Sequence, residues 1–548
     1  MTQGALEAPA AWPRRRQDPR LRRRLIVAGG LVALALGLVG LGRLVPTVVE
    51  LTAGAPVRHA IAAELQRAHA PRGVAAFYAA RDDRPMWVET SGLWPFWTRE
   101  SLRPEAAQMA GIAAQPLPGT AADPAARALT ADVAAAASRR PADLARAEVA
   151  LSRALADRVL RRPPPGAELA FVDPDLAPPA DARGVLQQAA DAPSLAGHLA
   201  AVDQVNAIYR ALRDDLAKYR AEWSRLPQVK IPAGPTLGVG ESGERVRLLR
   251  IRLGLGGGDP SRPFDASLAG AVRRFQSAHG LVANGQADDA TVAALNAGPA
   301  YYERLIAANL QRARSLPAVA ARRFILVNVA AGQLWLYENG KVKSSMRVIV
   351  GARAEQTPMM AGLIRYLVVN PYWDVPVDLV RSSLAPKVLQ FGPSYLQSAN
   401  MEVLADWSDD SPEVDPRDVD WAGVAAGRLE LRVRQRPGGD NMMGQVKFML
   451  PNQLGIYLHD TPEKAAFQQP LRLLSAGCVR VERANDLAAW LLGHANPDAT
   501  WLAPDQRVDL DEATPVYITY LTAAPGASGV AFYPDVYGRD PALMAATA

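Results

Sequence analysis

The residues with the clearest potential for chemistry in this chain are a cysteine and a histidine. Cys478 is the only cysteine among 548 residues, and it follows a turn of small residues at 475–477. His459 lies nineteen residues upstream, at the end of the apolar run 456–458. A thiol attacks as its thiolate, and a neighbouring imidazole can take its proton. The pair therefore predicts a cysteine nucleophile with a histidine as general base.

The turn in front of the cysteine can also provide a site for negative charge. The spacing of apolar residues over 484–492 predicts a helix just past the turn. If the helix begins there, the backbone N–H groups of Gly477 and Cys478 could face a developing oxyanion. The alternative is an inert thiol beside a capping histidine, because free cysteine is among the most buried residue types.

The sequence around these residues resembles a known catalytic signature. His-Asp-Thr-Pro at 459–462, followed by Ser-Ala-Gly-Cys-Val-Arg-Val at 475–481, resembles the signature of the YkuD-type L,D-transpeptidases. That signature is a His and then a Ser-x-Gly-Cys-x-Arg turn. Residues 436–448 and 370–376 look like the large, periplasmic, YcbB-like branch of the family. The resemblance favours a reactive cysteine over an inert one.

The resemblance implies a reaction on peptidoglycan. The donor would be the tetrapeptide stem, attacked after the L-centre of a diaminopimelate residue with release of the terminal D-Ala. The amine of a second stem peptide, the acceptor, would resolve the acyl-enzyme. Cys478 would be the nucleophile, His459 the base and then the acid, and the Gly477 and Cys478 amides the oxyanion donors. Lasting adducts with carbapenems are implied too, and no cofactor is.

Four residues near these motifs are candidates for contact with the substrate: Arg480, Tyr457, Trp373 and Ser475. Arg480 lies two residues beyond Cys478, hence on the same face of an extended chain, where it would hold a substrate carboxylate or brace the turn. Tyr457 shares a face with His459 and would border the donor pocket, and Trp373 would contribute through a lid. Core packing is the alternative for both aromatic residues.

Other functions stay open at this level. A zinc peptidase is disfavoured because no two histidines have helical spacing and His494 has no carboxylate or thiol grouped with it, so no metal site is predicted. Asp460 would point to the other strand face and is not predicted as a third catalytic member. A hydrolase or L,D-carboxypeptidase would pass the same acyl group to water. A membrane-tethered wall-binding scaffold would carry a vestigial catalytic domain, although the signature residues are intact.

The start of the chain predicts a membrane anchor. Seven arginines between Arg14 and Arg24 precede an uncharged run of eighteen residues, 25–42, which is at the short end for a membrane-spanning helix. Basic residues would keep segment 1–24 in the cytoplasm and send the chain beyond an anchor at 25–45 across the membrane. We therefore expect a single-pass protein of the bacterial inner membrane with its catalytic region in the periplasm. A cleaved signal peptide is the alternative.

The net charge of +6 owes much to those arginines, so it indicates membrane topology and no nucleic-acid partner. Beyond the anchor, composition and periodicity predict a multidomain α+β fold. Its parts are a helical scaffold region at 57–225, a three-helix peptidoglycan-binding module at 240–298, a mostly β YkuD-type catalytic domain at 322–522 with a lid-like insertion at 376–429, and a C-terminal tail at 523–548.

The module is predicted from three helix signals, the last at 288–295. The stretch 275–285 resembles the peptidoglycan-binding module, which implies binding to glycan strands. Phe275 and Leu281 are expected in its core. His279 is expected as a turn or capping residue rather than a metal ligand.

The catalytic domain is predicted from period-two alternation, which begins at 324–329 and continues at 333–338. Asn339-Gly340 is a hairpin signal. The last predicted strand is 516–520. The strand rhythm breaks over 376–429, and long insertions in enzymes are often lids. A loop that merely covers a sheet edge is the alternative.

Overall fold

The computed structural model describes residues 55–91, 99–115, 124–160, 166–203, 206–317, 322–408, 410–494, 503–526 and 529–546. The predicted cytoplasmic segment 1–24 and membrane anchor 25–45 lie outside these ranges. Within them, no helix has both the length and the apolar character needed to cross a membrane. The chain divides into two compact units, and the second contains residues 160–180 and 197–548.

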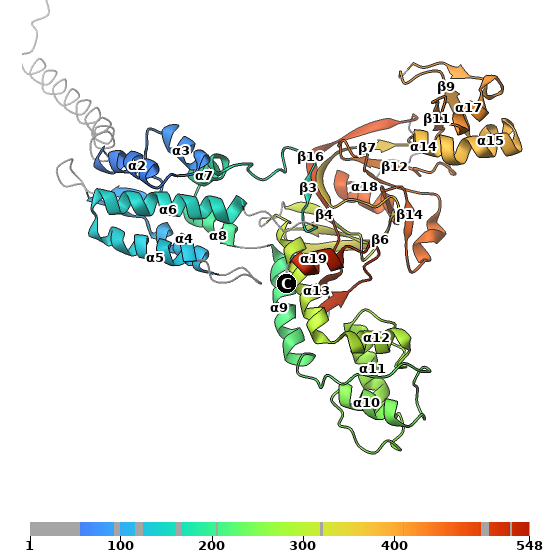
Figure 1. The fold of residues 1–548 in the computed structure, drawn as a ribbon. Coiled ribbons are helices and arrows are strands. Elements are labelled where there is room, and N and C mark those ends of the chain that lie inside the picture. The colour runs from blue at the N-terminus through green and yellow to red at the C-terminus, as the bar shows by residue number, and fades with distance from the viewer. Residues whose placement is uncertain are drawn as a thin grey trace, which may run out of the picture. The chain divides into compact units, whose positions relative to one another are not determined.

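The first unit is helical with one short hairpin (blue and cyan in Figure 1). Its elements are α2 (Ala55–Arg67), α3 (Arg72–Ala79), β1 (Val88–Ser91), β2 (Arg99–Leu102), α4 (Pro104–Ala114), α5 (Pro124–Ala135), η2 (Ala136–Ser138), α6 (Pro141–Leu160) and α7 (Ala182–Asp191). The next helix, α8 (Leu195–Asp203), belongs mostly to the second unit. The buried carboxylate of Glu148 on α6 accepts bonds from the Tyr78 hydroxyl and the Trp87 amide. Because a buried carboxylate needs such partners, this network fixes α3 and the chain after it against α6.

The second unit is built around a ten-stranded sheet of mixed direction. Its strands are β3 (Ala170–Phe171), β4 (Arg323–Asn328), β5 (Gln333–Glu338), β6 (Lys341–Gly351), β7 (Met360–Val369), β12 (Val446–Met449), β13 (Leu458–His459), β14 (Leu473–Ser475), β15 (Val479–Val481) and β16 (Gln506–Thr519). They follow the order β12, β13, β15, β6, β5, β4, β16, β7, β3, and β12 also pairs with β7. The sheet therefore closes on itself as a barrel, filled by one large apolar cluster.

The hairpin turn predicted at Asn339-Gly340 is confirmed, and it joins β5 to β6. Asn339 and Gly340 have φ angles of 51° and 74°, the left-handed values that a two-residue hairpin turn requires. The predicted strand 516–520 is the end of β16, which pairs parallel with β4 and antiparallel with β7. The mostly β character predicted for residues 322–522 is confirmed by these pairings.

The module predicted at 240–298 consists of α10 (Glu244–Arg252), α11 (Ala266–Ala278) and α12 (Asp289–Ala297). Asp265 and Asp288 cap the second and third helices by accepting a bond from a first-turn amide. Phe275 is buried in the core of the module and Leu281 packs against that core, as predicted.

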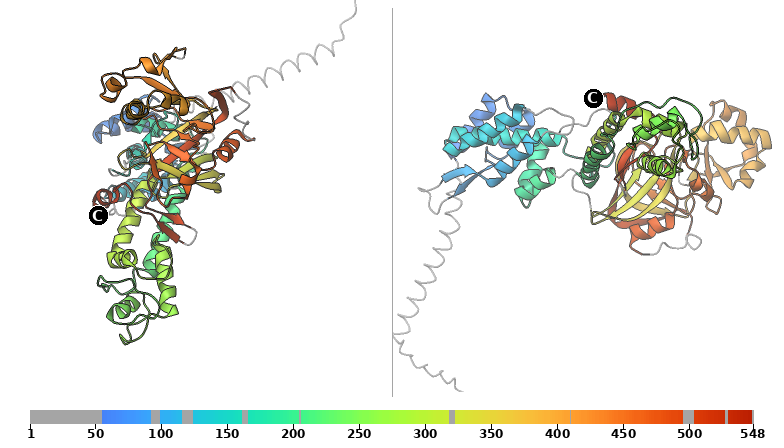
Figure 2. Two further views of the ribbon diagram at one scale, coloured as in Figure 1. Left: turned by 90° about the vertical axis from the view of Figure 1, so that its right-hand side faces the viewer. Right: turned by 90° about the horizontal axis from the view of Figure 1, so that it is seen from below.

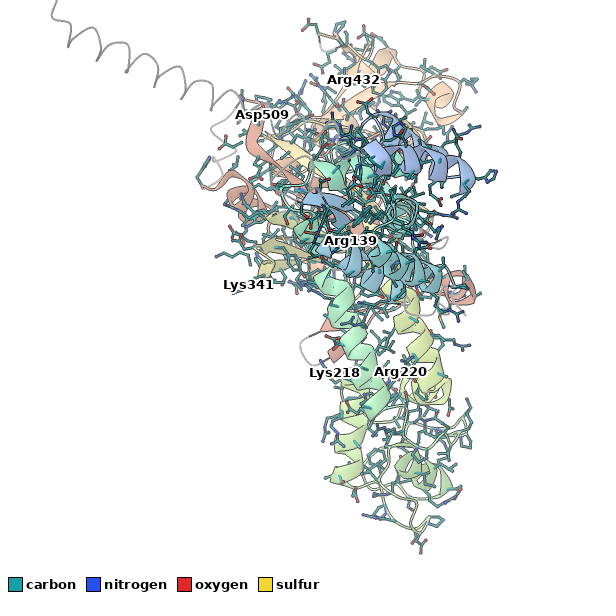
Figure 3. The ribbon with its side chains drawn as sticks, turned by 90° about the vertical axis from the view of Figure 1, so that its left-hand side faces the viewer. Arg139, Lys218, Arg220, Lys341, Arg432 and Asp509 are labelled. Atoms are coloured by element: carbon teal, nitrogen blue, oxygen red, sulfur yellow. The ribbon has the colours of Figure 1, made fainter. Side chains whose placement is uncertain are left out.

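Two long helices lie outside that module, α9 (Ala207–Glu222) and α13 (Pro299–Arg314). They share one apolar cluster, and Arg220 of α9 (Figure 3) donates to Glu303 of α13 over 2.7 Å. The sequence assigns α9 to the helical region 57–225, but it packs within the second unit. The helix α13 is absent from the sequence-based expectation.

The C-terminal residues, expected as a polar tail, are folded. They form the hairpin of β17 (Ala523–Gly526) and β18 (Gly529–Phe532) and the helix α19 (Asp540–Ala546). Phe532 is buried in the cluster between α9 and α13. Asp540, 4% exposed, pairs with Arg312 of α13, 0% exposed, over 2.6 Å. This segment is therefore part of the core of the second unit.

The break in strand rhythm at 376–429 corresponds to a small folded subdomain, called the lid subdomain from here on (residues 373–435; orange in Figure 2). It contains β8 (Trp373–Asp374), α14 (Val377–Leu379), η3 (Val380–Leu384), α15 (Ala385–Phe391), α16 (Ser394–Ser398), β9 (Met401–Leu404), β10 (Glu413–Val414), η4 (Pro416–Asp418), α17 (Trp421–Ala425) and β11 (Arg432–Gln435). Its strands pair in the order β10, β9, β11, β8, and it has its own apolar core around Trp421 and Val433. An insertion with a separate core can move as one body.

Candidate active site

The turn that carries Cys478, called the cysteine turn from here on (residues 475–478), joins β14 to β15. Gly477 has a φ of +106°, where residues with a Cβ are strained. A Cβ at this position would also lie 3.2 Å from Ile456 Cδ1. The backbone of the turn therefore requires glycine immediately before the cysteine.

The Ser475 side chain stabilises the cysteine turn through two hydrogen bonds to its backbone. Its hydroxyl donates to the Cys478 carbonyl over 2.6 Å and accepts the Gly477 amide at 3.3 Å. Ser475 is buried. A contact of this side chain with the substrate, predicted from the sequence, would have to be made in addition to these two bonds.

The helix predicted over 484–492 is confirmed as α18 (Ala484–Leu492). The strand β15 lies between the cysteine turn and this helix. The N-terminus of α18 therefore gives no argument for an oxyanion site at the turn. Of the two candidate amides, that of Gly477 donates to Ser475 Oγ, whereas no residue in the described part of the chain accepts a bond from that of Cys478.

His459 ends the two-residue strand β13, which pairs parallel with β15 so that His459 lies opposite Arg480. The Tyr457 carbonyl accepts the amide of Val479 over 3.1 Å, which brings Tyr457 alongside Cys478. Successive residues of a strand alternate between faces, so Tyr457 and His459 share one face. The cysteine and the histidine are therefore diagonal neighbours across the paired segments.

A backbone carbonyl fixes the proton of the His459 ring. His459 Nδ1 lies 2.6 Å from the Asp460 carbonyl oxygen. Because a carbonyl only accepts, Nδ1 carries the hydrogen, and Nε2 of the neutral ring keeps its lone pair for a proton. His459 is 3% exposed. The orienting group of this histidine is thus a peptide carbonyl.

The resting state of the pair is neutral. Burial lowers the pKa of His459 to about 3, and the positive charges of Arg480 and Lys447 act in the same direction against the bond to Asp460. Burial raises the pKa of the Cys478 thiol, opposed by the amide and hydroxyl of Tyr457 and by Arg480. In the structure the thiol donates to the Gly455 carbonyl at 3.5 Å. A neutral thiol and a neutral imidazole on neighbouring strands are suited to proton transfer during attack rather than to a preformed ion pair.

Tyr457 lies beside both members of the pair. Its ring centroid is 5.6 Å from that of His459, and its hydroxyl donates to Met443 Sδ at 3.5 Å. Burial raises the pKa of Tyr457, and so does the neighbouring Cys478. This phenol therefore stays protonated and can donate a hydrogen bond near the sulfur.

Arg480 lines a cavity of about 590 Å³. The other lining residues are Met442, Glu463, Ala465, Ala466, Gln469 and Leu474. Arg480 Nη1 donates to Glu463 Oε2 over 2.6 Å, while its buried Nε has no partner among the described residues. The guanidinium is thus held by one exposed carboxylate and keeps a free donor.

Trp373 belongs to the lid subdomain. It pairs with Gln435 of β11 and packs against the core of that subdomain. Its predicted contact with the substrate stays a prediction.

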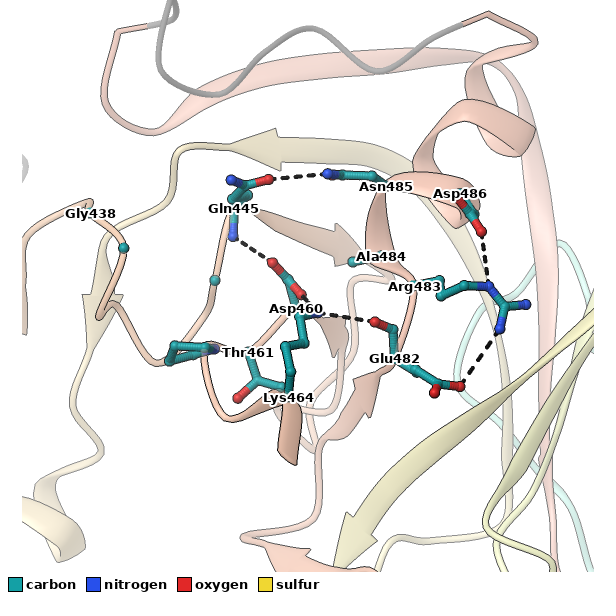
Figure 4. Close-up of a pocket in the computed structure, with 13 residues that line it drawn as sticks. Gly438, Gln445, Asp460, Thr461, Lys464, Glu482, Arg483, Ala484, Asn485 and Asp486 are labelled. Atoms are coloured by element: carbon teal, nitrogen blue, oxygen red, sulfur yellow. Dashed lines mark hydrogen bonds and ion pairs between the residues drawn. The ribbon is translucent and has the colours of Figure 1, made fainter. Parts of the chain in front are cut away.

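The carboxylate of Asp460 serves a second cavity of about 370 Å³ (Figure 4). It accepts the Gln445 amide over 2.9 Å and pairs with Lys464. Asp460 therefore contributes its carbonyl to His459 and its side chain elsewhere, which agrees with its exclusion as a third catalytic carboxylate. In the described ranges, no three His, Cys, Asp or Glu side chains are grouped closely enough to hold a metal ion.

Two residues that the sequence did not single out support the same turn, one directly and the other through the first. Thr357, in the loop between β6 and β7, donates from Oγ1 to the Gly477 carbonyl over 2.8 Å. Tyr537, in the expected tail, accepts the Thr357 amide at 3.2 Å. These contacts join positions 120 and 180 residues apart, so no local pattern could have indicated them.

Comparisons with known proteins agree with these features. Residues 322–518 match the family model of the L,D-transpeptidase catalytic domain (YkuD), residues 242–295 that of the "Putative peptidoglycan binding domain", and residues 72–216 that of the Scaffold domain. A "Putative L,D-transpeptidase" of Haemophilus influenzae is 35% identical over 241 residues, which cover 43% of this chain and 48% of that protein. The match thus spans about half the length of this curated relative.

Solved structures are more distantly similar. An L,D-transpeptidase from Mycobacterium smegmatis is 12% identical, with 36% of this chain and 59% of that chain covered and a TM-score of 0.19. An L,D-transpeptidase from Enterococcus faecium is 12% identical, with 37% and 52% covered and a TM-score of 0.17.

Proposed function

Because the chain carries the catalytic domain of the YkuD-type L,D-transpeptidases together with a peptidoglycan-binding module, we propose that it cross-links diaminopimelate residues of peptidoglycan stem peptides. The acyl carrier is a thioester on Cys478. The donor is a tetrapeptide stem, and the acceptor is the side-chain amine of a second stem peptide.

The first half-reaction follows from the neutral pair. His459 Nε2 takes the thiol proton as Cys478 Sγ attacks the carbonyl carbon at the L-centre of the donor diaminopimelate. The bond from that carbon to the D-Ala nitrogen breaks, and the imidazolium returns the proton to the leaving amine. The Cys478 amide stabilises the oxygen that becomes negative on the way.

The second half-reaction reverses these roles. The acceptor amine attacks the thioester carbon and loses a proton to His459 Nε2, and the carbon–sulfur bond breaks. The departing sulfur regains the proton from the imidazolium, which restores the neutral thiol. No other proton carrier is needed.

The observation that carries the proposal is the bond from His459 Nδ1 to the Asp460 carbonyl. It leaves Nε2 as an acceptor at every pH above the lowered pKa of the ring, which is about 3. A histidine in this state can cycle a proton in both half-reactions.

The cavity beside Arg480 is the proposed site for the donor stem. Its one cation is the Arg480 guanidinium, which is suited to binding a substrate carboxylate. Leu474, which is exposed at 45% on the cavity wall, offers apolar surface to the aliphatic part of the donor. Glu463 competes for the guanidinium and would be displaced when a stem carboxylate binds.

We propose that the 25–45 run anchors the chain in the bacterial inner membrane, with the module and the catalytic domain in the periplasm. The motivation is the cluster of arginines before the apolar run. Recovery from cells of a soluble form that begins near Ala55 would contradict it.

The decisive experiment incubates the full-length protein with disaccharide-tetrapeptide and separates the products by mass. A cross-linked dimer is expected, and Cys478→Ala should form none while remaining folded. If trimmed tripeptide is the only product, water is the acceptor. If the substrate is unchanged, the alternative of a wall-binding scaffold without activity is favoured.

A further inference from the structure

A buried threonine holds the peptide group that joins Gly477 to Cys478. We propose that Thr357 is a positioning residue, which orients the Cys478 amide as the oxyanion donor, and that Tyr537 keeps Thr357 in place. This inference rests on the proposed function, because it assigns a role within the acylation step. Neither residue touches the reacting atoms.

The orientation follows from the planarity of the peptide group. Thr357 Oγ1 donates to the Gly477 carbonyl over 2.8 Å. In a trans peptide the C=O of one residue and the N–H of the next lie in one plane and point in opposite directions. A bond that fixes the Gly477 carbonyl therefore fixes the Cys478 N–H on the far side, where no described residue accepts it.

The hydroxyl of Thr357 has a single suitable orientation. Thr357 is 0% exposed, and Oγ1 accepts the Gly351 amide over 2.9 Å. Since the Gly477 carbonyl can only accept, the hydroxyl hydrogen must point to it. The same bond draws electron density toward the carbonyl oxygen, which makes the Cys478 N–H a stronger donor through the peptide group.

The loop that carries Thr357 folds back tightly on itself and is hydrogen-bonded to Tyr537 of the C-terminal segment. A Cβ on Gly351 would lie 2.0 Å from the Glu355 carbonyl oxygen, so the loop folds back directly onto this glycine. The Tyr537 hydroxyl donates to the Gly351 carbonyl over 2.7 Å and accepts the Thr357 amide at 3.2 Å. The Tyr537 ring stacks on Tyr520 with centroids 5.4 Å apart.

Loss of the threonine hydroxyl should slow acylation of the Cys478 thiol and leave its alkylation unchanged. Acylation places negative charge on a carbonyl oxygen and needs an oriented donor. Alkylation by iodoacetamide displaces iodide from a saturated carbon and forms no oxyanion. A difference between the two rates therefore reports on the amide, separately from the reactivity of the sulfur.

The test measures both rates on the full-length protein. Acylation is followed with 4-nitrophenyl acetate, whose acyl carbon bonds to Cys478 Sγ as 4-nitrophenolate leaves, and alkylation with iodoacetamide. For Thr357→Val we expect acylation to fall roughly 10- to 100-fold, somewhat less than the 10²–10³ known for outright removal of a donor. Alkylation should be unchanged, and Thr357→Ser should restore acylation.

Thr519→Val is the matched control, since Thr519 is also buried and its Oγ1 donates to a backbone carbonyl, that of Val327, over 3.0 Å. It should change neither rate. If Thr357→Val does not fold, Tyr537→Phe carries the test and must show the same selective loss.

The inference is overturned if acylation is unchanged, if alkylation falls by the same factor, or if the ester does not acylate the wild-type Cys478. The proposed function fails on a different result, the absence of a cross-linked product from the tetrapeptide. The ester assay uses no peptidoglycan, so the two failures are distinguishable.

Discussion

Arg480 lies in register with His459 on the neighbouring parallel strand. Its charge is the largest cause after burial of the lowered pKa of His459, and it lowers the pKa of Cys478 against the effect of burial. One guanidinium therefore helps to keep the His459 imidazole unprotonated and makes the Cys478 thiol easier to ionise.

Arg480→Gln should raise the pKa of the Cys478 thiol further. The measurement is the rate of alkylation by iodoacetamide as a function of pH, whose midpoint reports thiolate formation. The midpoint should move to higher pH in Arg480→Gln and stay near the wild-type value in Arg480→Lys. Arg483→Gln is the control, because Arg483 pairs with the exposed Asp486. Equal midpoints in wild type and Arg480→Gln would contradict the electrostatic role.

His279 should make the stability of the second unit depend on pH. Its Nδ1 donates to the Phe275 carbonyl over 2.8 Å, and its Nε2 accepts the Tyr219 hydroxyl at 3.0 Å. Burial lowers the pKa of His279 to about 4, whereas an unfolded histidine titrates near 6.5. Between these values the unfolded chain binds the extra proton, so the free energy of unfolding falls as the pH falls from about 6.5 to about 4.

His279→Gln removes this titration, and the urea midpoint should then fall less between pH 7 and pH 5 than in wild type. His459 contributes with the same sign, so the dependence is reduced rather than abolished. The exposed His494 provides the control. His494→Gln should keep the wild-type dependence, and a His279→Gln protein that keeps it as well would show that the buried ring is not its source.

Asp540 should be essential to the stability of the second unit. Its ion pair with Arg312 is buried on both sides, and removal of one partner of such a pair typically costs about 3–5 kcal/mol because the other charge is left buried and uncompensated. Asp540→Asn should therefore lower the free energy of unfolding by about that amount, measured by urea denaturation. Arg220→Gln breaks the exposed pair with Glu303 and should cost about 0–1 kcal/mol. Equal losses in the two variants would contradict the assignment of the tail to the core.

Much of the fold could be predicted because its signals are local. The Asn339-Gly340 turn adopts the left-handed backbone that such a pair favours, and Asp288 caps the helix that it was predicted to start. In both cases a few adjacent residues determine the conformation. The candidate catalytic pair could be predicted for the same reason, since Cys478 and His459 lie in one short stretch of the sequence.

The features that sequence reasoning missed depend on distant contacts. Tyr537 reaches Gly351 across 186 residues, and Asp540 reaches Arg312 across 228. The sequence of a polar C-terminal segment does not indicate such distant partners, so the sequence predicts a tail at 523–548. The strand β15 between the cysteine turn and α18 is not predicted, because it has only three residues, too few for a period-two pattern to be recognised.

The last prediction concerns covalent inhibition. A β-lactam acylates the nucleophile that its strained carbonyl reaches, and the resemblance to YkuD-type enzymes implies lasting thioesters with carbapenems. We expect meropenem to form a stable adduct on Cys478. Intact-protein mass spectrometry follows the adduct with time, and Cys478→Ala is the control that should stay unmodified. A wild-type protein that stays unmodified, or that is modified on another peptide, would contradict the mechanism.

The structure adds the pH dependence of this reaction. Because burial raises the pKa of Cys478, the thiol is protonated at neutral pH and needs His459 Nε2 as a base. His459→Gln should slow acylation at neutral pH by the roughly 10²–10⁴-fold expected of a general base, with little effect on initial binding. At higher pH the thiol ionises without help, so the gap between wild type and variant should narrow. If the ratio of the wild-type and variant acylation rates stays constant with pH, His459 acts by shape or packing. If acylation is undiminished in the variant, His459 is not the base.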